Sequence, residues 1–184
     1  MPAPIFTVPN QLTFLRLAFL PLFLISVYYD HYDWALGILC AAALSDALDG
    51  LLARRLNQKT ALGAYLDPIA DKLLLSSSFF VLALKGKVSW WVTILVLSRD
   101  VLMLATALVI LLVVGYRPLP PTFYGKLCTV VQIVFVFTVV LLAVFPGEAL
   151  ELLRRYLVYA TVGLTVFSGL HYSFVVARRL SRPT

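Results

Sequence analysis

The sequence predicts an all-α protein, an integral membrane bundle of six transmembrane helices. Of its 184 residues, 61% are hydrophobic and 13% are charged, and the mean hydropathy is +0.94. These values exclude a soluble enzyme, a disulfide scaffold and a disordered chain. The apolar residues form continuous runs rather than alternating patterns, so they predict membrane helices and not a barrel. Six spans of about 20 residues use nearly the whole length, which predicts one membrane domain over residues 1–184.

The boundaries of the spans follow from the apolar runs and from the residues that interrupt them. The first run ends at the polar stretch 30–33, and the second is followed by a loop over about 54–66. A Gly-Lys pair at 86–87 follows the third run, the Gly- and Pro-rich stretch 115–121 follows the fourth, and a Pro-Gly pair at 146–147 follows the fifth. We therefore expect spans at about 11–29, 34–56, 67–85, 90–114, 122–145 and 152–177.

Basic residues gather on one side of the predicted bundle. The N-terminus, the loops at 54–66 and 115–126, and the C-terminal tail share that side and carry most of the loop-associated Lys and Arg, so we expect it to face the cytoplasm. Arg154 and Arg155, on the opposite side, weaken this prediction without reversing it. The net charge of +6 also indicates contact with anionic lipid. The N-terminus lacks a basic region and a cleavage site, so we expect the first span to be retained.

Five of the nine acidic residues lie inside or at the ends of the predicted spans, where a charge is costly and indicates function. They are Asp46, Asp49, Asp67, Asp71 and Asp100. At 100° per residue, the first two share one stripe of the second helix with Gly50, Ala53 and Arg54. The third and fourth are four residues apart and share a face of the third helix, which Gly63 continues if that helix starts early.

The two aspartate pairs are expected to lie at the same depth, one to two turns inside the cytoplasmic boundary, because the second helix runs toward the cytoplasm and the third runs back. Four carboxylates in one poorly hydrated pocket repel one another or stay protonated unless cations neutralise them. Oxygen ligands favour hard ions, so the pattern predicts Mg²⁺ or Mn²⁺, as two ions with bridging oxygens, as in enzymes that act on phosphate esters. Arg54 adds a fork that can bind phosphate.

Simpler structural interpretations exist for the single residues. Asp67 could be an N-cap with Pro68 at the first helical position. Asp46 or Asp49 could form a structural bridge with Arg54 or Arg55. The small residues could serve helix packing alone. None of these explains why four carboxylates occur at one depth.

The stretch DALDGLLARRLNQKTALGAYLDPIAD, residues 46–71, resembles the CDP-alcohol phosphatidyltransferases. It fits the D-x2-D-G-x2-A-R-x8-G-x3-D-x3-D signature of that family without a mismatch, at eight fixed positions across 26 residues. The layout of six spans is also similar to the family, as are VPNQLTFLRL at the start of the chain and PTFYGKLCTVVQ at the opening of the fifth helix. The resemblance implies transfer of a phosphatidyl group from CDP-diacylglycerol to an acceptor hydroxyl, with CMP leaving.

The resemblance also assigns roles to the signature residues. Asp46, Asp49 and Asp67 would bind the metal ions, and Asp71, also a ligand, would be the base that deprotonates the acceptor hydroxyl. The CDP-donor site would comprise Gly50 and Ala53 beside the cytidine, Arg54 on the phosphates, and Gly63. The resemblance further implies a bacterial inner membrane enzyme with its active site toward the cytoplasm, and homodimers are usual in the family.

Acceptor choice is expected to depend on other polar residues near the pocket. Arg99 and Lys126 are the candidates for acceptor binding, while the roles of Arg16, Asp100 and Gln132 stay open. Alternatively, Arg99 forms a structural pair with its neighbour, and Lys126 is a topology anchor. LSRDVLMLATALVI and RPLPPTFYGKLCTVVQI resemble the cardiolipin synthases of the family, which use phosphatidylglycerol. Glycerol 3-phosphate, the acceptor of phosphatidylglycerophosphate synthases, is the alternative, and serine or choline also stay open.

Two other classes of function deserve comparison. A cation or proton transporter would place carboxylates along a path across the membrane, whereas four of them here lie near one face. A noncatalytic scaffold would carry a damaged signature, and every signature position is intact. The sequence therefore favours the enzyme.

Overall fold

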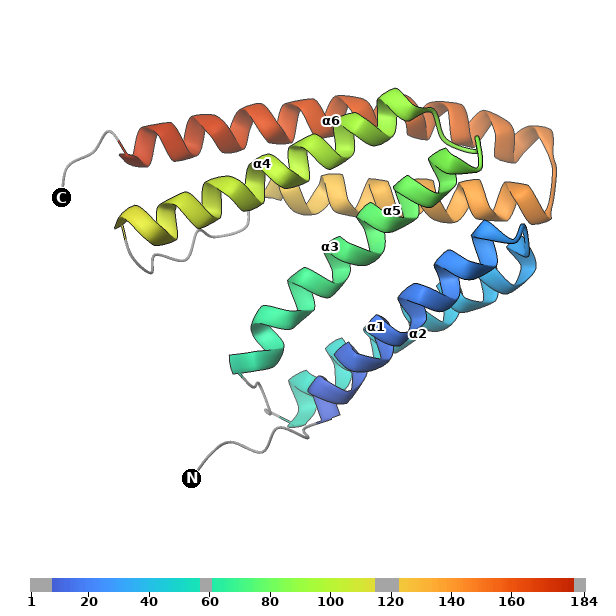
Figure 1. Ribbon diagram of the computed structural model, residues 1–184, viewed down its shortest axis with the longest axis horizontal. Coiled ribbons are helices and arrows are strands. Elements are labelled where there is room, and N and C mark those ends of the chain that lie inside the picture. Colours follow the sequence, from blue (N-terminus) through green and yellow to red (C-terminus); the bar gives the residue numbers. More distant parts are fainter. Residues whose placement is uncertain (1–7, 57–60, 115–122, 181–184) are drawn as a thin grey trace. The chain divides into compact units, whose positions relative to one another are not determined.

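The protein is helical throughout the part of the chain that the structure describes. The computed structural model describes residues 8–56, 61–114 and 123–180, with the side chains of 18–45, 72–106 and 123–174. These residues form six helices and no strand, in agreement with the all-α prediction (Figure 1). The helices are α1 (Val8–Tyr28), α2 (Tyr32–Leu56), α3 (Ala61–Leu84), α4 (Trp90–Val114), α5 (Phe123–Val144) and α6 (Glu148–Leu180).

Four helices, α1, α2, α3 and α6, begin earlier than the predicted spans, and the difference is largest for α3 and α6. α3 starts at Ala61 rather than near residue 67, because the segment 61–66 is apolar and continues the helix ahead of Asp67. The prediction was wrong here because an Asp-Pro pair is also a common way to start a helix. α6 starts at Glu148 rather than near residue 152, since acidic side chains in a first turn interact favourably with the helix dipole.

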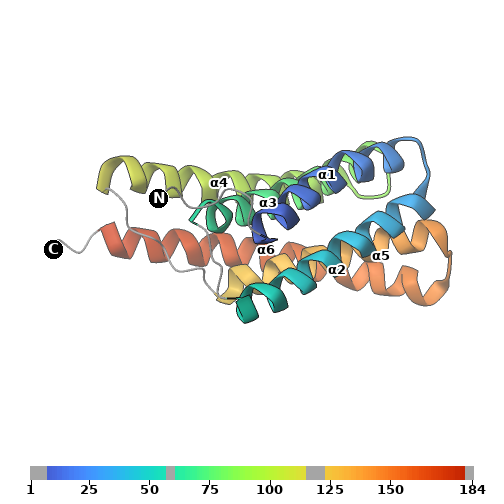
Figure 2. The ribbon, with the colours of Figure 1, turned by 90° about the horizontal axis from the view of Figure 1, so that it is seen from below.

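The chain divides into two compact units. The first comprises Met1–Lys87 with Val140–Pro146, and the second comprises Val88–Val139 with Gly147–Thr184. In the first unit α1 packs against both α2 and α3. In the second unit α4 packs against α6, and α5 runs beside α6, as Figures 1 and 2 show. The expectation of one domain over residues 1–184 stays a prediction.

Several polar side chains are buried and many large apolar side chains are exposed, a combination that is unusual for a soluble protein. Tyr159 is 75% exposed, Phe123 is 73% exposed and Trp34 is 69% exposed, while Arg99 and Gln132 are among the buried residues. Two segments, α5 and residues 148–174 of α6, are long and apolar enough to cross a membrane. These observations fit a protein in contact with lipid, and six spans stay a prediction.

α1 and α3 end in the same C-terminal motif. Asp30 has φ 62° and Gly86 has φ 67°, the left-handed region in which a helix commonly ends. In each motif the next residue donates its N–H to the carbonyl five residues earlier, at 2.8 Å for His31 and 2.9 Å for Lys87. Glycine adopts this conformation freely, and aspartate is one of the few other residues that tolerate it.

An ion pair connects these two helix ends within the first unit. Lys85 Nζ donates to Asp30 Oδ2 at 2.5 Å and to the carbonyl oxygen of Tyr28 at 3.1 Å, and the Tyr32 hydroxyl donates to Asp30 Oδ1 at 3.0 Å. The hydrogen bond from Lys85 holds the pKa of the Asp30 carboxyl below its usual 3.8. Burial, followed by the bond to Asp30, raises the pKa of Tyr32 to about 12.

We predict that the Asp30–Lys85 pair makes thermal stability depend on acid pH. Because the pKa of Asp30 is lowered on folding, its contribution is complete above about pH 5 and is lost as the pH falls below 3.8. Asp30→Asn keeps a residue that tolerates positive φ and removes the charge. Melting temperatures of the detergent-solubilised protein should therefore be lower for this variant at pH 7 and converge with wild type near pH 3.

A matched comparison is Lys85→Met, which removes the ion-pair partner of Asp30. In the Lys85→Met background, adding Asp30→Asn should no longer cause a pH-dependent difference in melting temperature. An offset between wild type and Asp30→Asn that stays constant from pH 7 to pH 3 would contradict the assignment to this pair.

Candidate functional site

The helices α2 and α3 carry the eight signature residues. Asp46 lies ten residues before the end of α2 at Leu56, and Asp71 lies ten residues after the start of α3 at Ala61. At about 1.5 Å per residue, both pairs of aspartates thus stand about 10–15 Å from the ends that residues 57–60 connect. Both helices also pack against α1. The two aspartate pairs therefore lie at similar distances from the connected ends of α2 and α3, and both of these helices pack against α1.

The early start of α3 bears on how Asp67 is interpreted. Asp67 is the seventh residue of the helix and Pro68 is the eighth, so Asp67 is not its N-cap. Gly63 also lies within α3, four residues before Asp67. Residues four apart lie on the same face of a helix, so Gly63 continues the face that carries Asp67 and Asp71. The N-cap alternative is therefore wrong.

The predicted donor and metal residues lie outside the described side chains. The side chains of residues 46–71 are not among those described, so the convergence of Asp46, Asp49, Asp67 and Asp71, and the donor roles of Gly50, Ala53, Arg54 and Gly63, stay predictions. Among the side chains that are described, no three His, Cys, Asp or Glu residues gather as metal ligands would.

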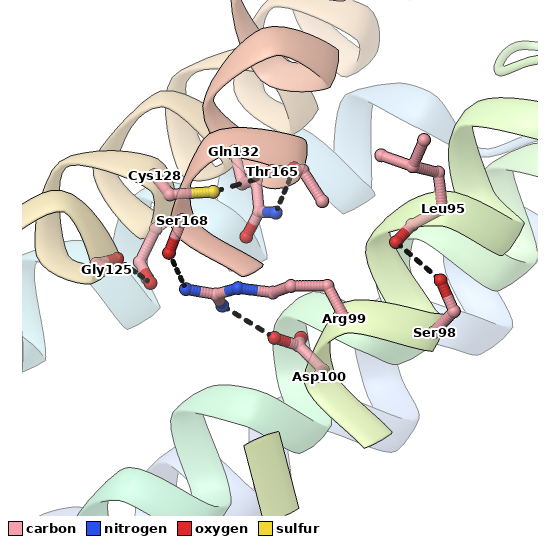
Figure 3. A network of polar contacts seen from close by, with 10 residues as sticks. Leu95, Ser98, Arg99, Asp100, Gly125, Cys128, Gln132, Thr165 and Ser168 are labelled. Atoms are coloured by element: carbon pink, nitrogen blue, oxygen red, sulfur yellow. Dashed lines mark hydrogen bonds and ion pairs between the residues drawn. The ribbon is translucent and has the colours of Figure 1, made fainter. Parts of the chain in front are cut away.

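In the second unit, Arg99 of α4 forms a buried polar network. Arg99 and Asp100 are each 4% exposed, and Arg99 Nη1 donates to Asp100 Oδ1 at 2.8 Å. Arg99 Nη2 donates to the hydroxyl of Ser168 on α6 at 2.9 Å (Figure 3). α6 lies close to the arginine stem, since a methyl group added at Gly169 would be 3.8 Å from Arg99 Cγ. Asp100 thus neutralises the charge of Arg99, and the bond to Ser168 connects α4 to α6.

A second group of polar contacts joins α5 to the same face of α6. The amide nitrogen of Gln132 donates to the Thr165 hydroxyl at 3.3 Å, and the Cys128 thiol lies 3.5 Å from that hydroxyl. Thr161, Thr165 and Ser168 follow one another at helical spacing, and all are buried. This face of α6 is therefore a polar stripe between α4 and α5.

Two buried side chains of this network have a polar atom without a hydrogen-bond partner among the described residues. They are Arg99 at Nε and Gln132 at Oε1, and Figure 3 shows the Gln132 amide pointing from α5 toward the side of the network that holds Arg99. Unsatisfied buried donors and acceptors are costly, so these two atoms are places in the network where a water molecule or a ligand can bind. The network can therefore accept one more polar group.

Lys126, the other candidate for acceptor binding, is not part of this network. It is exposed, whereas Cys128 is buried, and the two positions differ by about 200° around α5. Two residues before Lys126, Tyr124 of α5 packs edge-on against His171 of α6, with 5.1 Å between the ring centroids. The structure does not bring Lys126 and Arg99 together.

Comparison with known proteins now identifies the family. A family model for CDP-alcohol phosphatidyltransferase matches residues 6–167, which include the signature. The chain belongs to the CDP-alcohol phosphatidyltransferase family. This confirms the resemblance found in the sequence, and the chain is an enzyme of phospholipid biosynthesis.

Relatives in this family carry two different activities in their names. A Mycobacterium tuberculosis protein named "Probable phosphatidylglycerophosphate synthase" is 37% identical over 186 residues, covering 97% of this chain and 84% of the relative. A Streptomyces coelicolor cardiolipin synthase (CMP-forming) is 35% identical, with 97% and 86% covered. The human cardiolipin synthase (CMP-forming) is 31% identical, with 90% and 61% covered. The phosphatidyltransferase is therefore similar to enzymes that are named for different products.

Sequence reasoning missed Ser168, the α6 partner of Arg99. The signal available was the spacing of Thr161, Thr165 and Ser168 at i, i+4 and i+7, which places three hydroxyls on one face of an apolar helix. Single serines in membrane helices usually bond to their own backbone, as Ser173 does with the Gly169 carbonyl at 3.0 Å.

We predict that Ser168→Ala destabilises the phosphatidyltransferase. Because the hydroxyl accepts a charge-assisted bond from a buried arginine, its removal should lower the unfolding free energy by about 1.5–3 kcal/mol. The matched control is Ser173→Ala on the same helix, where the hydroxyl is exposed and bonds to its own helix, and the loss should be less than about 0.5 kcal/mol. Denaturant titration in detergent micelles measures both, and equal losses would contradict the network's role.

Proposed function

We propose that this phosphatidyltransferase transfers a phosphatidyl group from CDP-diacylglycerol to an alcohol acceptor, releases CMP, and depends on two divalent metal ions. The observation that carries the proposal is the intact signature on α2 and α3, the two helices that pack against α1. The match of the family model across the signature supports it.

The donor set of the signature fits a hard divalent ion. Four carboxylates offer oxygen ligands only, which suit Mg²⁺ or Mn²⁺. We assign Asp46, Asp49 and Asp67 as ligands, with Asp71 beside them. Such ions would offset the negative charge of the donor pyrophosphate, of the attacking acceptor oxygen and of the leaving CMP oxygen.

The remaining signature residues are assigned to the CDP donor and to proton transfer. Arg54 holds the donor phosphates through its planar fork, and Gly50, Ala53 and Gly63 leave room for the nucleotide. Asp71 accepts the proton of the acceptor hydroxyl. The acceptor oxygen then forms its bond to the phosphatidyl phosphorus while the bond from that phosphorus to the CMP oxygen breaks.

The acceptor that we propose is phosphatidylglycerol, which would make the product cardiolipin. The resemblance of the fourth and fifth helices to cardiolipin synthases supports this choice, as do the Streptomyces and human relatives. Arg99 is assigned to the acceptor phosphate, and the exposed Lys126 to drawing anionic acceptors toward the start of α5. Glycerol 3-phosphate is the second candidate, favoured by the Mycobacterium relative.

We further propose that the six helices span a bacterial inner membrane, with the signature toward the cytoplasm. We also propose that the protein forms a homodimer. The excess of basic residues in the loops of the cytoplasmic side supports the orientation. Arg154 and Arg155, which oppose it, both contact Glu151, at 2.6 Å and 3.5 Å. The two arginines weaken the predicted orientation without reversing it, because most of the loop-associated Lys and Arg lie on the other side.

The reaction is tested by CMP release from purified protein. With CDP-diacylglycerol and Mg²⁺, phosphatidylglycerol should give CMP and cardiolipin, identified by mass spectrometry, while glycerol 3-phosphate should give little product. EDTA should abolish turnover, and Mg²⁺ or Mn²⁺ should restore it, because the carboxylates require cations. Turnover that persists in EDTA would remove the metal mechanism. Absence of CMP with every acceptor would favour the transporter.

Asp71→Asn separates the proposed base from the metal ligands. We expect turnover to fall by about 10²-fold or more, because general-base catalysis contributes on that order, while binding of CDP-diacylglycerol largely survives. Equilibrium binding of the labelled donor and initial rates of CMP release measure the two effects. Asp33→Asn, an acidic residue of α2 outside the signature, is the control and should stay near wild type. Loss of donor binding together with turnover would reassign Asp71 chiefly to the metal.

A further inference from the structure

Arg99 is already partly occupied by groups of its own unit. Its two terminal nitrogens donate to Asp100 at 2.8 Å and to Ser168 at 2.9 Å, while Nε has no partner among the described residues. The guanidinium is 4% exposed and Gln132, whose Oε1 is also unpartnered, is fully buried. One polar group of a ligand can therefore bond to Nε, with Gln132 available to a hydroxyl.

Within the ion pair of Arg99 and Asp100, the negative charge of the carboxylate offsets the positive charge of the guanidinium. Arg99 and Asp100 form an ion pair at 2.8 Å. Among the described Lys and Arg side chains of the second unit, Arg99 alone is buried, since Lys126 and Arg155 are exposed and Arg154 is partly exposed and paired with Glu151. No second buried cation in that described part is available to balance a ligand with two negative charges.

A neutral ion pair distinguishes anions by their charge. The attraction between an anion and the nearby guanidinium grows in proportion to the charge of the anion, but the cost of removing the anion from water grows with the square of that charge. A monoanion can therefore bind where a dianion of similar shape cannot. The phosphate of a phosphodiester carries one negative charge, whereas a phosphomonoester approaches two near neutral pH.

We propose that Asp100 determines acceptor specificity: by neutralising Arg99, it selects a phosphodiester acceptor and disfavours a phosphomonoester. This inference rests on the proposed transferase function and on the assignment of Arg99 to the acceptor phosphate. Asp100 acts through Arg99 and does not contact the reacting atoms. Ser168 keeps the guanidinium oriented, so that Nε is the nitrogen presented to the ligand.

Two soluble probes test the proposal on the wild-type protein. Glycerol 3-phosphate and its methyl ester differ mainly in charge, because the ester is a phosphodiester monoanion. Each is added as a competitor, and the readout is the cardiolipin formed from phosphatidylglycerol, because both probes carry hydroxyls that could accept the phosphatidyl group and release CMP themselves. The methyl ester should inhibit at a concentration about tenfold lower than glycerol 3-phosphate, and equal or stronger inhibition by glycerol 3-phosphate would overturn the inference.

Asp100→Asn tests the residue itself. Asparagine still offers an oxygen to Arg99 Nη1 but leaves the guanidinium charge unbalanced. The ratio of kcat/KM for glycerol 3-phosphate to that for phosphatidylglycerol should rise about tenfold, chiefly through a lower KM for glycerol 3-phosphate. Asp100→Glu should restore the wild-type ratio, and Ser98→Ala, an exposed neighbour whose hydroxyl bonds to its own helix, should leave it unchanged.

The outcomes separate the inference from the function on which it rests. If wild type releases CMP and Asp100→Asn loses activity with both acceptors in equal proportion, the ion pair is structural and the inference is wrong. If Asp100→Asn does not fold, the competition experiment on wild type decides. If wild type releases no CMP with any acceptor, the proposed function fails, and the inference fails with it.

Discussion

A buried charge in an apolar helix has to be neutralised and hydrogen-bonded by the protein itself, and this constraint organises the second unit. Removing an unpaired ion from water costs several kcal/mol even after relaxation. Arg99 meets the requirement with Asp100, the next residue of α4, and with Ser168 of α6. The first bond is local to one helix, whereas the second fixes the contact of α4 with α6. The polar stripe on α6 then also determines which face α5 meets, through Gln132 and Thr165.

The first unit meets the same constraint differently. Ser26 and Ser78 donate to carbonyls four residues earlier in their own helices, so these two bonds connect no helices. The ion pair of Lys85 and Asp30 lies instead at the helix ends, where water is available. Apolar side chains such as Phe23 and Phe79, both fully buried, fill its core.

Much of the fold follows from the sequence, because apolar runs long enough to cross a bilayer allow few other structures. All six helices were predicted, and the start of α3 was wrong because Asp67-Pro68 is compatible with both a helix start and a helix interior. The signature residues could be named because their spacing is specific. Ser168 could not, since a serine that bonds to a distant arginine and one that bonds to its own helix, such as Ser173, look alike until the neighbouring helix is known.

Acceptor choice is a separate physical problem from the transfer reaction. Relatives named for phosphatidylglycerophosphate synthesis and for cardiolipin synthesis are 37% and 35% identical to this chain, each over 97% of its length. Similarity over the whole chain thus does not distinguish two acceptors that differ in charge and size. A few polar side chains outside the signature must therefore make the distinction. Arg99 and Asp100 meet that requirement, because a buried ion pair responds to the charge of its ligand, whereas the apolar surface around it does not.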